Sequence, residues 1–83
     1  MKEGSTIQHT LVLRRVDPEE NIARFYALMI ERDLLGRVAL VRGWGRIGTR
    51  GRERADLHAD ETAAAEALAS LAAAKRRRGY QDL

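Results

Sequence analysis

The chain contains no cysteine, a single proline, a single tryptophan and few aromatic residues, which make up 5% of its 83 residues. The absence of cysteine excludes disulfide bonds and metal sites built from thiolates. The two histidines, His9 and His58, have no potential ligand at a metal-binding spacing, so we expect no metal and no cofactor. No stretch approaches the roughly 20 apolar residues that a membrane-spanning helix needs, so we expect no membrane partner.

Sequence patterns associated with catalysis are also missing. The chain has no Ser/His/Asp arrangement, and its short glycine spacings, Gly45-x-x-Gly48 and Gly48-x-x-Gly51, lack the lysine of a phosphate-binding loop. The carboxylates of Asp60 and Glu61 are explained by capping of a helix. We therefore expect a binding module and not an enzyme, with no small-molecule substrate. No apolar segment of a signal peptide follows the first residues, so we expect a cytoplasmic protein.

Charge is unevenly distributed along the chain. The formal net charge is +3, from 15 basic and 12 acidic residues. Residues 17–33 are mainly acidic, whereas residues 37–54 contain six arginines and a single carboxylate, Glu53. A second basic cluster runs from Lys75 to Arg78. Such concentrated positive charge suggests an anionic partner. Most of the basic residues are arginine, which forms bidentate pairs with phosphate and stacks on flat surfaces.

The first half of the chain predicts two strands. Alternating apolar and polar residues predict a strand over residues 7–16, and the segment Asp17-Pro18-Glu19-Glu20-Asn21 predicts a turn. The apolar run over residues 23–32 fits a buried helix as well as a strand, since its leucine, methionine and alanine residues favour a helix. We predict a strand, because a hairpin-like turn over residues 33–36 and a further strand follow it.

Residues 37–46 and 49–57 are predicted to pair as a hairpin around a tight turn at Ile47-Gly48, because glycine tolerates the positive φ of such turns. A bulge at Gly43 or Gly45 would break the register of this pairing. With regular pairing, one face of the hairpin carries Trp44 together with arginines from both strands: Arg42, Arg46, Arg50, Arg52 and Arg54.

The C-terminal part predicts a helix. Asp60 is a favourable N-cap, and alanine-rich sequence follows from residue 63 to residue 74. The basic residues of Lys75–Arg78 complement the negative end of the helix dipole, and Gly79 is suited to end the helix. This helix has only two leucines as large apolar side chains, so we expect its alanines to pack closely on a sheet and the core to be thin.

Each conspicuous feature allows a structural and a functional interpretation. Trp44 is either a packing residue or an exposed aromatic surface that stacks on a sugar or base. The arginine run is either a solvated strand face, kept charged against edge pairing, or a set of phosphate contacts. The cluster Lys75–Arg78 either complements the helix dipole or contacts phosphate as well.

One short sequence carries a resemblance to a known family. The residues Trp44-Gly45-Arg46, extended by Ile47-Gly48 and Gly51, resemble the sequence for which the WGR domain, a small module, is named. The features on either side occur in the same order as in that family. A tripeptide alone would be weak support, but the order of all these features is specific.

The resemblance covers nearly the whole chain. Residues 21–30, which contain Phe25-Tyr26, resemble the "NKFY" strand that precedes the Trp-Gly-Arg sequence in the family. Lys75–Tyr80 resembles the family's basic ending, in which a glycine precedes an aromatic residue. The similarity extends over roughly residues 7–80, so we expect a single WGR-like domain within residues 1–83. It implies an α+β fold, a small antiparallel sheet of about four strands with one C-terminal helix packed across it.

The resemblance also implies a function. In DNA-dependent poly(ADP-ribose) polymerases this module contacts DNA at breaks, where its tryptophan stacks on the terminal sugar and basic residues approach the 5′-terminal phosphate. Carried over, Trp44 would stack at a DNA end or nick, and Arg46 would contact phosphate or a neighbouring domain. The residues expected to bind nucleic acid are Trp44, Arg42, Arg46, Arg50, Arg52, Lys75, Arg76, Arg77, Arg78 and Tyr80.

A second function remains open at this point. The chain also resembles stand-alone bacterial members of the family, including those grouped with molybdate-metabolism regulators. It contains no ADP-ribosyltransferase domain, so no polymerase activity is implied. A small sheet with a thin core and a free edge could dock on a protein partner, or on a second copy as a homo-oligomer. The alternative to nucleic-acid binding is therefore a protein-interaction or regulatory module.

Overall fold

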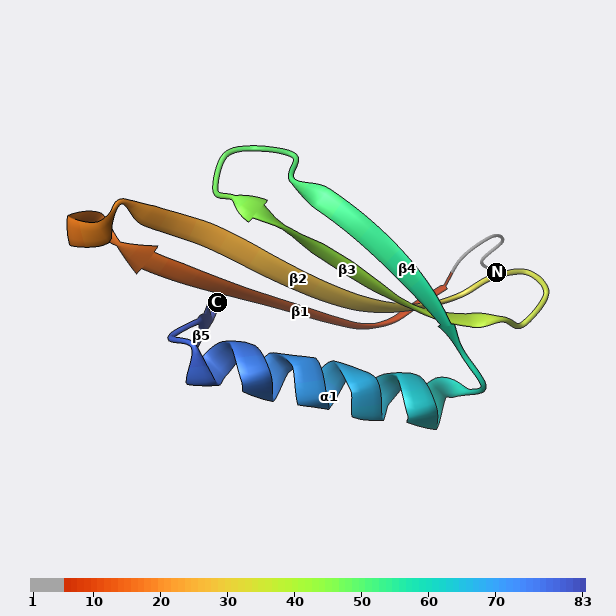
Figure 1. The fold of residues 1–83 in the computed structure, drawn as a ribbon. Helices are drawn as coiled ribbons and strands as arrows, with labels where there is room; N and C mark the ends of the chain where they lie inside the picture. The colour runs from red at the N-terminus through yellow and green to blue at the C-terminus, as the bar shows by residue number, and fades with distance from the viewer. Residues whose placement is uncertain (1–5) are drawn as a thin grey trace.

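The computed structural model describes the backbone of residues 6–83 and the side chains of residues 10–83. Five strands and one long helix follow one another along the chain (Figure 1). Their bounds are β1 Thr6–Asp17, η1 Pro18–Glu20, β2 Ile22–Arg32, β3 Val38–Arg46, β4 Arg52–His58, α1 Glu61–Arg77 and β5 Gln81–Asp82. The run over residues 23–32 is a strand, as predicted. No helix within the described part of the chain is long and apolar enough to cross a membrane.

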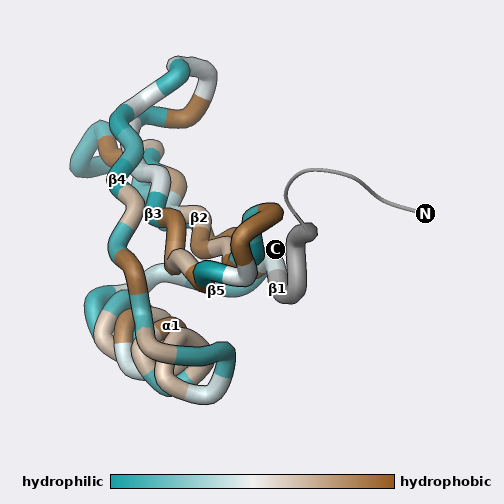
Figure 2. The backbone as a smooth tube through the Cα atoms, turned by 90° about the vertical axis from the view of Figure 1, so that its right-hand side faces the viewer, coloured by the Kyte–Doolittle hydropathy of each residue, from teal (hydrophilic) through white to brown (hydrophobic). Residues whose placement is uncertain are grey.

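The strands form one antiparallel sheet in the order β4-β3-β2-β1-β5. The α+β architecture is as expected, with one strand more than the four predicted: β5 adds two residues beside β1. The helix α1 lies across one face of the sheet and leaves the other face uncovered (Figures 1 and 2). The β1–β2 hairpin extends past the C-terminal end of α1 (Figure 1).

The hairpin between β3 and β4 differs from the prediction. The predicted turn at Ile47-Gly48 is present: Gly48 has φ +93°, and the Thr49 N–H donates to the Arg46 carbonyl at 3.0 Å. However, β4 begins at Arg52 and not at residue 49, so this turn is part of a longer loop over residues 47–51. The pairing of β3 is continuous through Gly43 and Gly45, without a bulge. Within the described residues, the register shift of the sheet lies near the start of β1, between residues 7 and 9.

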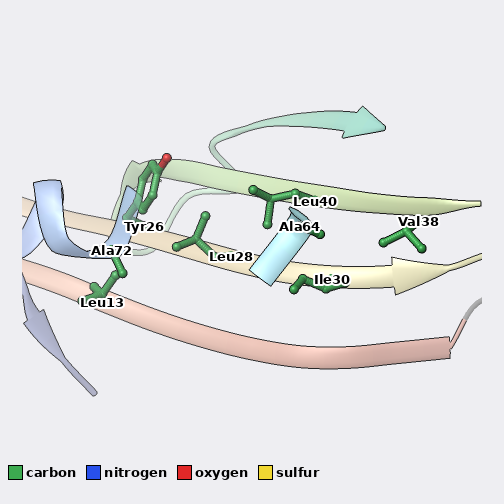
Figure 3. Packing of buried hydrophobic residues seen from close by; sticks show 8 residues of the cluster. All are labelled: Leu13, Tyr26, Leu28, Ile30, Val38, Leu40, Ala64 and Ala72. Carbon is green, nitrogen blue, oxygen red and sulfur yellow. The ribbon is translucent and has the colours of Figure 1, made fainter. Parts of the chain in front are cut away.

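The core lies between α1 and the sheet (Figure 3). Its fully buried large side chains are Leu13, Leu28, Ile30 and Leu40. The helix contributes Ala64 and Ala72, whose small side chains let the helix backbone approach the sheet closely. The core is therefore thin, as the alanine-rich helix predicted.

Local hydrogen bonds hold the ends of these elements. The Asp60 carboxylate accepts a 2.8 Å hydrogen bond from the Ala63 N–H and so caps α1. At the other end, the Tyr80 N–H donates to the Lys75 carbonyl at 3.1 Å, and the Gly79 N–H donates to the Arg76 carbonyl at 3.0 Å. Gly79 has φ +95°, which an L side chain rarely adopts, so this is a Schellman motif closed by glycine.

Candidate nucleic-acid interface

Trp44 lies on the face of the sheet that α1 covers. In the register of the sheet it lies opposite Tyr26 of β2 on one side and Arg52 of β4 on the other. Its side chain is half-buried and packs against the core cluster. The two interpretations of Trp44 are thus compatible, because one part of the indole packs while another part remains open to solvent.

Two glycines let the loop over residues 47–51 fold back beside Trp44. A Cβ atom added at Gly45 would lie 2.7 Å from the Gly51 Cα atom. A Cβ atom added at Gly51 would lie 2.3 Å from the Trp44 carbonyl oxygen and 2.8 Å from the Phe25 ring. Only glycine fits at these positions, so the middle residue of Trp44-Gly45-Arg46 is fixed by packing of the loop.

Lys75 extends from the last turn of α1 toward two aromatic rings. Its Nζ atom lies 4.5 Å from the centre of the Tyr26 ring and 5.4 Å from that of Tyr80. The two tyrosine rings meet edge to face, with centroids 6.4 Å apart and planes at 68°. Because Tyr26 lies opposite Trp44, the lysine, both tyrosines and the tryptophan share one end of the space between helix and sheet.

The surroundings of Lys75 are cationic. Partial burial lowers the pKa of the Lys75 ammonium, and the positive charges of Arg78, Arg24 and Arg42 lower it further. Among the described side chains, no carboxylate forms an ion pair with Lys75. Positive charges around an ammonium that has no ion pair of its own disfavour its protonated state, and a bound anion would relieve that cost. The arrangement is therefore suited to hold a phosphate.

Arg42 connects this cationic cluster to β4. Its Nη2 atom donates to the Asp56 carboxylate at 3.3 Å, and Asp56 also accepts a 3.1 Å hydrogen bond from Arg54 Nε. The Nε atom of Arg42 is buried and has no hydrogen-bond partner among the described residues. Asp56 therefore neutralises part of the Arg42 charge, and the buried Nε–H of Arg42 is left unpaired among the described residues.

Arg46 is held by the turn between β1 and β2. Its guanidinium donates to the Asn21 carbonyl and to the Asn21 side-chain oxygen, each at 3.3 Å. Asn21 adopts the left-handed conformation, with φ 56°. Arg46 thus joins the end of β3 to this turn of the same chain. The resemblance had implied that Arg46 contacts phosphate or a neighbouring domain.

The four basic residues at the end of α1 have different surroundings. Arg76 forms a bidentate pair with Asp82, with both contacts at 2.8 Å. This hydrogen bonding lowers the pKa of Asp82 and raises that of Arg76. Arg77 and Arg78 are exposed, and the Arg78 charge acts on Lys75. Lys75 and Arg78 therefore belong to the cationic cluster, whereas Arg76 links α1 to β5 through its pair with Asp82.

Arg50 does not share the face of Trp44 as predicted. It lies in the loop over residues 47–51 and not in a strand, so the alternation that predicted its position does not apply. It borders a hollow on the opposite face, over Phe25 and Met29. Arg52 does lie opposite Trp44, at the start of β4.

Two residues of the site, Tyr26 and Arg24, were not predicted. The pairing of β2 with β3 places Tyr26 opposite Trp44 and Arg24 opposite Arg46. The sequence held a signal for both, because a hairpin centred on the turn at residues 33–37 pairs residues in this register. From the sequence alone, Tyr26 stands out only through the resemblance to the "NKFY" strand, and Arg24 is one of two arginines in the acidic segment of residues 17–33.

Comparisons with known proteins show what the chain as a whole is similar to. The family model of the WGR domain matches residues 9–83. The chain is 41% identical over 73 residues to "Uncharacterized protein y4dW" of Sinorhizobium fredii (strain NBRC 101917 / NGR234), in a match that covers 88% of the chain and 36% of that protein. The chain thus spans about a third of the length of this relative. No solved structure matches the chain.

Proposed function

The chain belongs to the WGR domain family, and on that basis we propose that it binds nucleic acid through the face that carries Trp44 and Lys75. The WGR domain is a binding domain and not a catalytic one, and in proteins of the poly(ADP-ribose) polymerase type it is generally a nucleic-acid-binding module. The partner proposed for this chain is DNA, at an end or a nick.

The cationic cluster around Lys75 is the observation that carries the proposal. Partial burial and three arginines lower the pKa of this ammonium. Its contacts are with two tyrosine rings and not with a carboxylate. A phosphate at this position would replace repulsion by charge-assisted hydrogen bonds, which are about twice as strong as neutral ones. Trp44 lies next to the cluster, so a nucleotide whose phosphate sits there would bring its sugar or base to the indole.

The preference for an end follows from how an aromatic ring stacks. Within an intact duplex both faces of each base are covered by neighbouring bases, and removing one from the stack costs a few kcal/mol. A terminal nucleotide offers a free face without that cost. Stacking on an aromatic side chain contributes ~1–3 kcal/mol per base, which corresponds to a preference for an end of roughly 5- to 150-fold.

The remaining predicted residues are assigned secondary roles. Arg42, whose side chain is 22% exposed, and Arg52, opposite Trp44, are proposed to contact the backbone of the same DNA strand. Tyr80 positions Lys75, and Arg78 adds charge beside it. Arg46 and Arg76 already have partners within the chain, so their contacts with DNA would be weaker.

The proposal is tested by titrating labelled DNA with the protein. The substrates are nicked, blunt and end-closed duplexes, the first two with and without a 5′-phosphate. If about four phosphates are neutralised, log K falls with log salt at a slope near −3.6 on duplex DNA. We expect the 5′-phosphorylated nick or end to bind tightest, and Trp44→Ala to remove that preference.

Two variants of equal charge change separate the site from general electrostatics. Lys75→Met removes the cation from the cluster, whereas Arg14→Met removes one from the exposed surface of the other face. Lys75→Met should lower affinity for the phosphorylated end far more than Arg14→Met. Equal effects of the two variants, together with affinity that ignores ends and Trp44→Ala, would show non-specific binding only.

A further inference from the structure

The face of the sheet opposite α1 is apolar and uncovered. Figures 1 and 2 show the helix on one side of the sheet only. The strand register places on the other side a set of small or apolar residues: Val12, Phe25, Ala27, Met29, Ala39, Val41, Gly43, Ala55 and Leu57. We refer to this set as the open face. Leu57, 68% exposed, and Ala55 are open to solvent, Val41 is buried, and the other members are partly exposed. Apolar patches of this kind on a small domain mark interaction sites.

A hollow of about 430 Å³ lies within the open face. Phe25, Ala27, Met29 and Gly43 line it, and Arg50 and Glu53 border it. Its volume falls within the range of pockets that hold a ligand or a large side chain. The hollow is therefore large enough to accept a bulky apolar side chain.

Gly43 lines the hollow without contributing a side chain to it. A Cβ atom added at Gly43 would meet only the Arg52 carbonyl oxygen, at an ordinary contact distance of 3.7 Å. Gly43 also lies outside the positive-φ residues of the chain. The backbone thus does not require glycine at residue 43, in contrast to Gly45, and glycine within a strand weakens it. Glycine at residue 43 weakens the strand, and the backbone does not require it. This suggests that the space left open beside residue 43 serves a function.

The charges around the hollow select its occupant. Arg14 lies opposite Phe25 on β1, and it lines a second hollow of about 290 Å³ with Val16, Gly79 and Gln81. Among the side chains that the structure describes, neither Arg14 nor Arg50 forms an ion pair. Glu53 is the single carboxylate at the rim of the larger hollow. Two free arginines flanking an aromatic floor complement an acidic ligand.

We propose that the open face docks an acidic, extended segment of a protein partner. A large aromatic or aliphatic side chain of that segment fills the hollow over Phe25, and carboxylates beside it pair with Arg14 and Arg50. A second copy of this chain is a poorer occupant, because it would bring the same two arginines against themselves. Nucleic acid is also a poorer occupant, since most of the open face is apolar. The site lies on the opposite side of the sheet from Trp44 and Lys75, so both sites can be filled at once.

Selection from a display library of random 12-residue peptides tests this proposal. The immobilised full chain is the target, with Gly43→Leu as the blocking variant and Ala69→Leu as its matched control. Leucine at residue 43 fills the hollow, whereas Ala69 is exposed on α1 and receives the same side chain away from it. We expect enriched peptides that combine an aromatic or long aliphatic residue with aspartate or glutamate. Gly43→Leu should weaken them at least tenfold, Ala69→Leu should not, and Arg14→Glu with Arg50→Glu should weaken them further.

Several results would overturn the proposal. These are no enrichment over an empty surface, enriched peptides without acidic residues, equal binding to Gly43→Leu, or competition by an oligonucleotide. Concentration-dependent sedimentation that Gly43→Leu abolishes would instead make the open face a self-association surface. Thermal unfolding of Gly43→Leu is the control that the variant folds. Its DNA affinity should equal that of the unaltered chain, so failure of the docking proposal leaves the DNA proposal standing.

Discussion

The ammonium nitrogen of Lys75 lies 4.5 Å from the centre of the Tyr26 ring, and the charges that lower its pKa are those of arginines. An aromatic face stabilises a cation by about 0.5–2 kcal/mol, without neutralising its charge. Lys75 is thus held in position and still available to an anion. This relationship connects the end of α1 to the strand opposite Trp44, and it underlies the proposed site.

The lowered pKa of Lys75 predicts how DNA binding depends on pH. The protonated ammonium attracts phosphate, and its pKa lies below the ordinary value of 10.5. As pH rises, Lys75 therefore loses its proton and its attraction before an ordinary lysine would. Affinity for a 5′-phosphorylated end should fall over this alkaline range, and the salt slope should decrease by about 0.9, one phosphate contact.

Lys75→Arg provides the control for that pH dependence. Arginine keeps its proton throughout the range, so the variant should retain affinity where the unaltered chain loses it. Fluorescence anisotropy titrations at a series of pH values measure both proteins. The same alkaline loss in Lys75→Arg would assign the titration to another group.

The packing around Gly45 predicts a difference between neighbouring glycines. Gly45→Ala places a Cβ atom 2.7 Å from the Gly51 Cα atom, so the loop over residues 47–51 must shift. Overpacking of this kind costs typically about 1–3 kcal/mol of unfolding free energy. Gly43→Ala meets no such contact and should be neutral or stabilise by about 0.5–1 kcal/mol. Urea unfolding of both variants measures the difference, and equal effects would contradict the close approach of Gly45 to Gly51.

The contact between Arg46 and Asn21 predicts a structural role for this arginine. Arg46→Ala removes two hydrogen bonds of 3.3 Å to an exposed turn, which should lower the unfolding free energy by about 0.5–1.5 kcal/mol. Asn21→Gly keeps the left-handed conformation and loses the side-chain acceptor. Urea unfolding of the two single variants and the double variant should therefore show non-additive losses.

Nucleic-acid affinity distinguishes the two roles of Arg46. If Arg46 acts mainly on the turn, Arg46→Ala weakens DNA binding less than Lys75→Met does. A loss of affinity in Arg46→Ala that exceeds the loss in Lys75→Met, with unchanged stability, would make Arg46 a direct DNA contact.

The pair between Arg76 and Asp82 predicts how the C-terminus responds to acid. The Arg76 hydrogen bonds lower the pKa of Asp82 in the folded state. The stabilisation from this pair is therefore present above the ordinary aspartate pKa, and it is lost as pH falls through the lowered value. Carboxyl NMR titration should show Asp82 ionised below the range of a free aspartate, and Arg76→Gln should return its pKa to that range. An ordinary pKa for Asp82 in the unaltered chain would mean that the pair does not form in solution.

Much of the fold was predictable from the sequence, because the spacing of apolar residues and the residues that cap the helix indicate the same elements. Alternation identified the strand over residues 7–16, and Asp60 and Gly79 marked the ends of the helix. The prediction of a strand over residues 23–32 depended on the turn that follows it, since the propensities of these residues also suit a helix. The turn at Ile47-Gly48 is present as predicted, but the predicted start of the next strand at residue 49 was wrong, because Gly51, with φ +73°, extends the loop and β4 starts at Arg52.

The site was less predictable, because long-range pairing decides it. Lys75 is separated from Tyr26 by most of the chain, and only the crossing of α1 over the sheet brings them together. The charge run from residue 75 to 78 gave no means to separate Lys75 from Arg76, whose partner Asp82 lies in a strand too short to predict. The predicted face of Arg50 was wrong because Arg50 lies in the loop over residues 47–51, and side chains alternate between two faces only within a strand.

The fluorescence of the single tryptophan tests the central proposal most directly. Trp44 is half-buried beside the cationic cluster, so its emission reports on anything bound there. A nicked hairpin duplex with a 5′-phosphate should quench the emission and protect it from iodide, and the dephosphorylated duplex should do so only at higher concentration. Lys75→Met should abolish that difference. If the phosphorylated duplex binds while Trp44 emission and iodide access stay unchanged, the nucleic acid lies elsewhere and the proposed site is wrong.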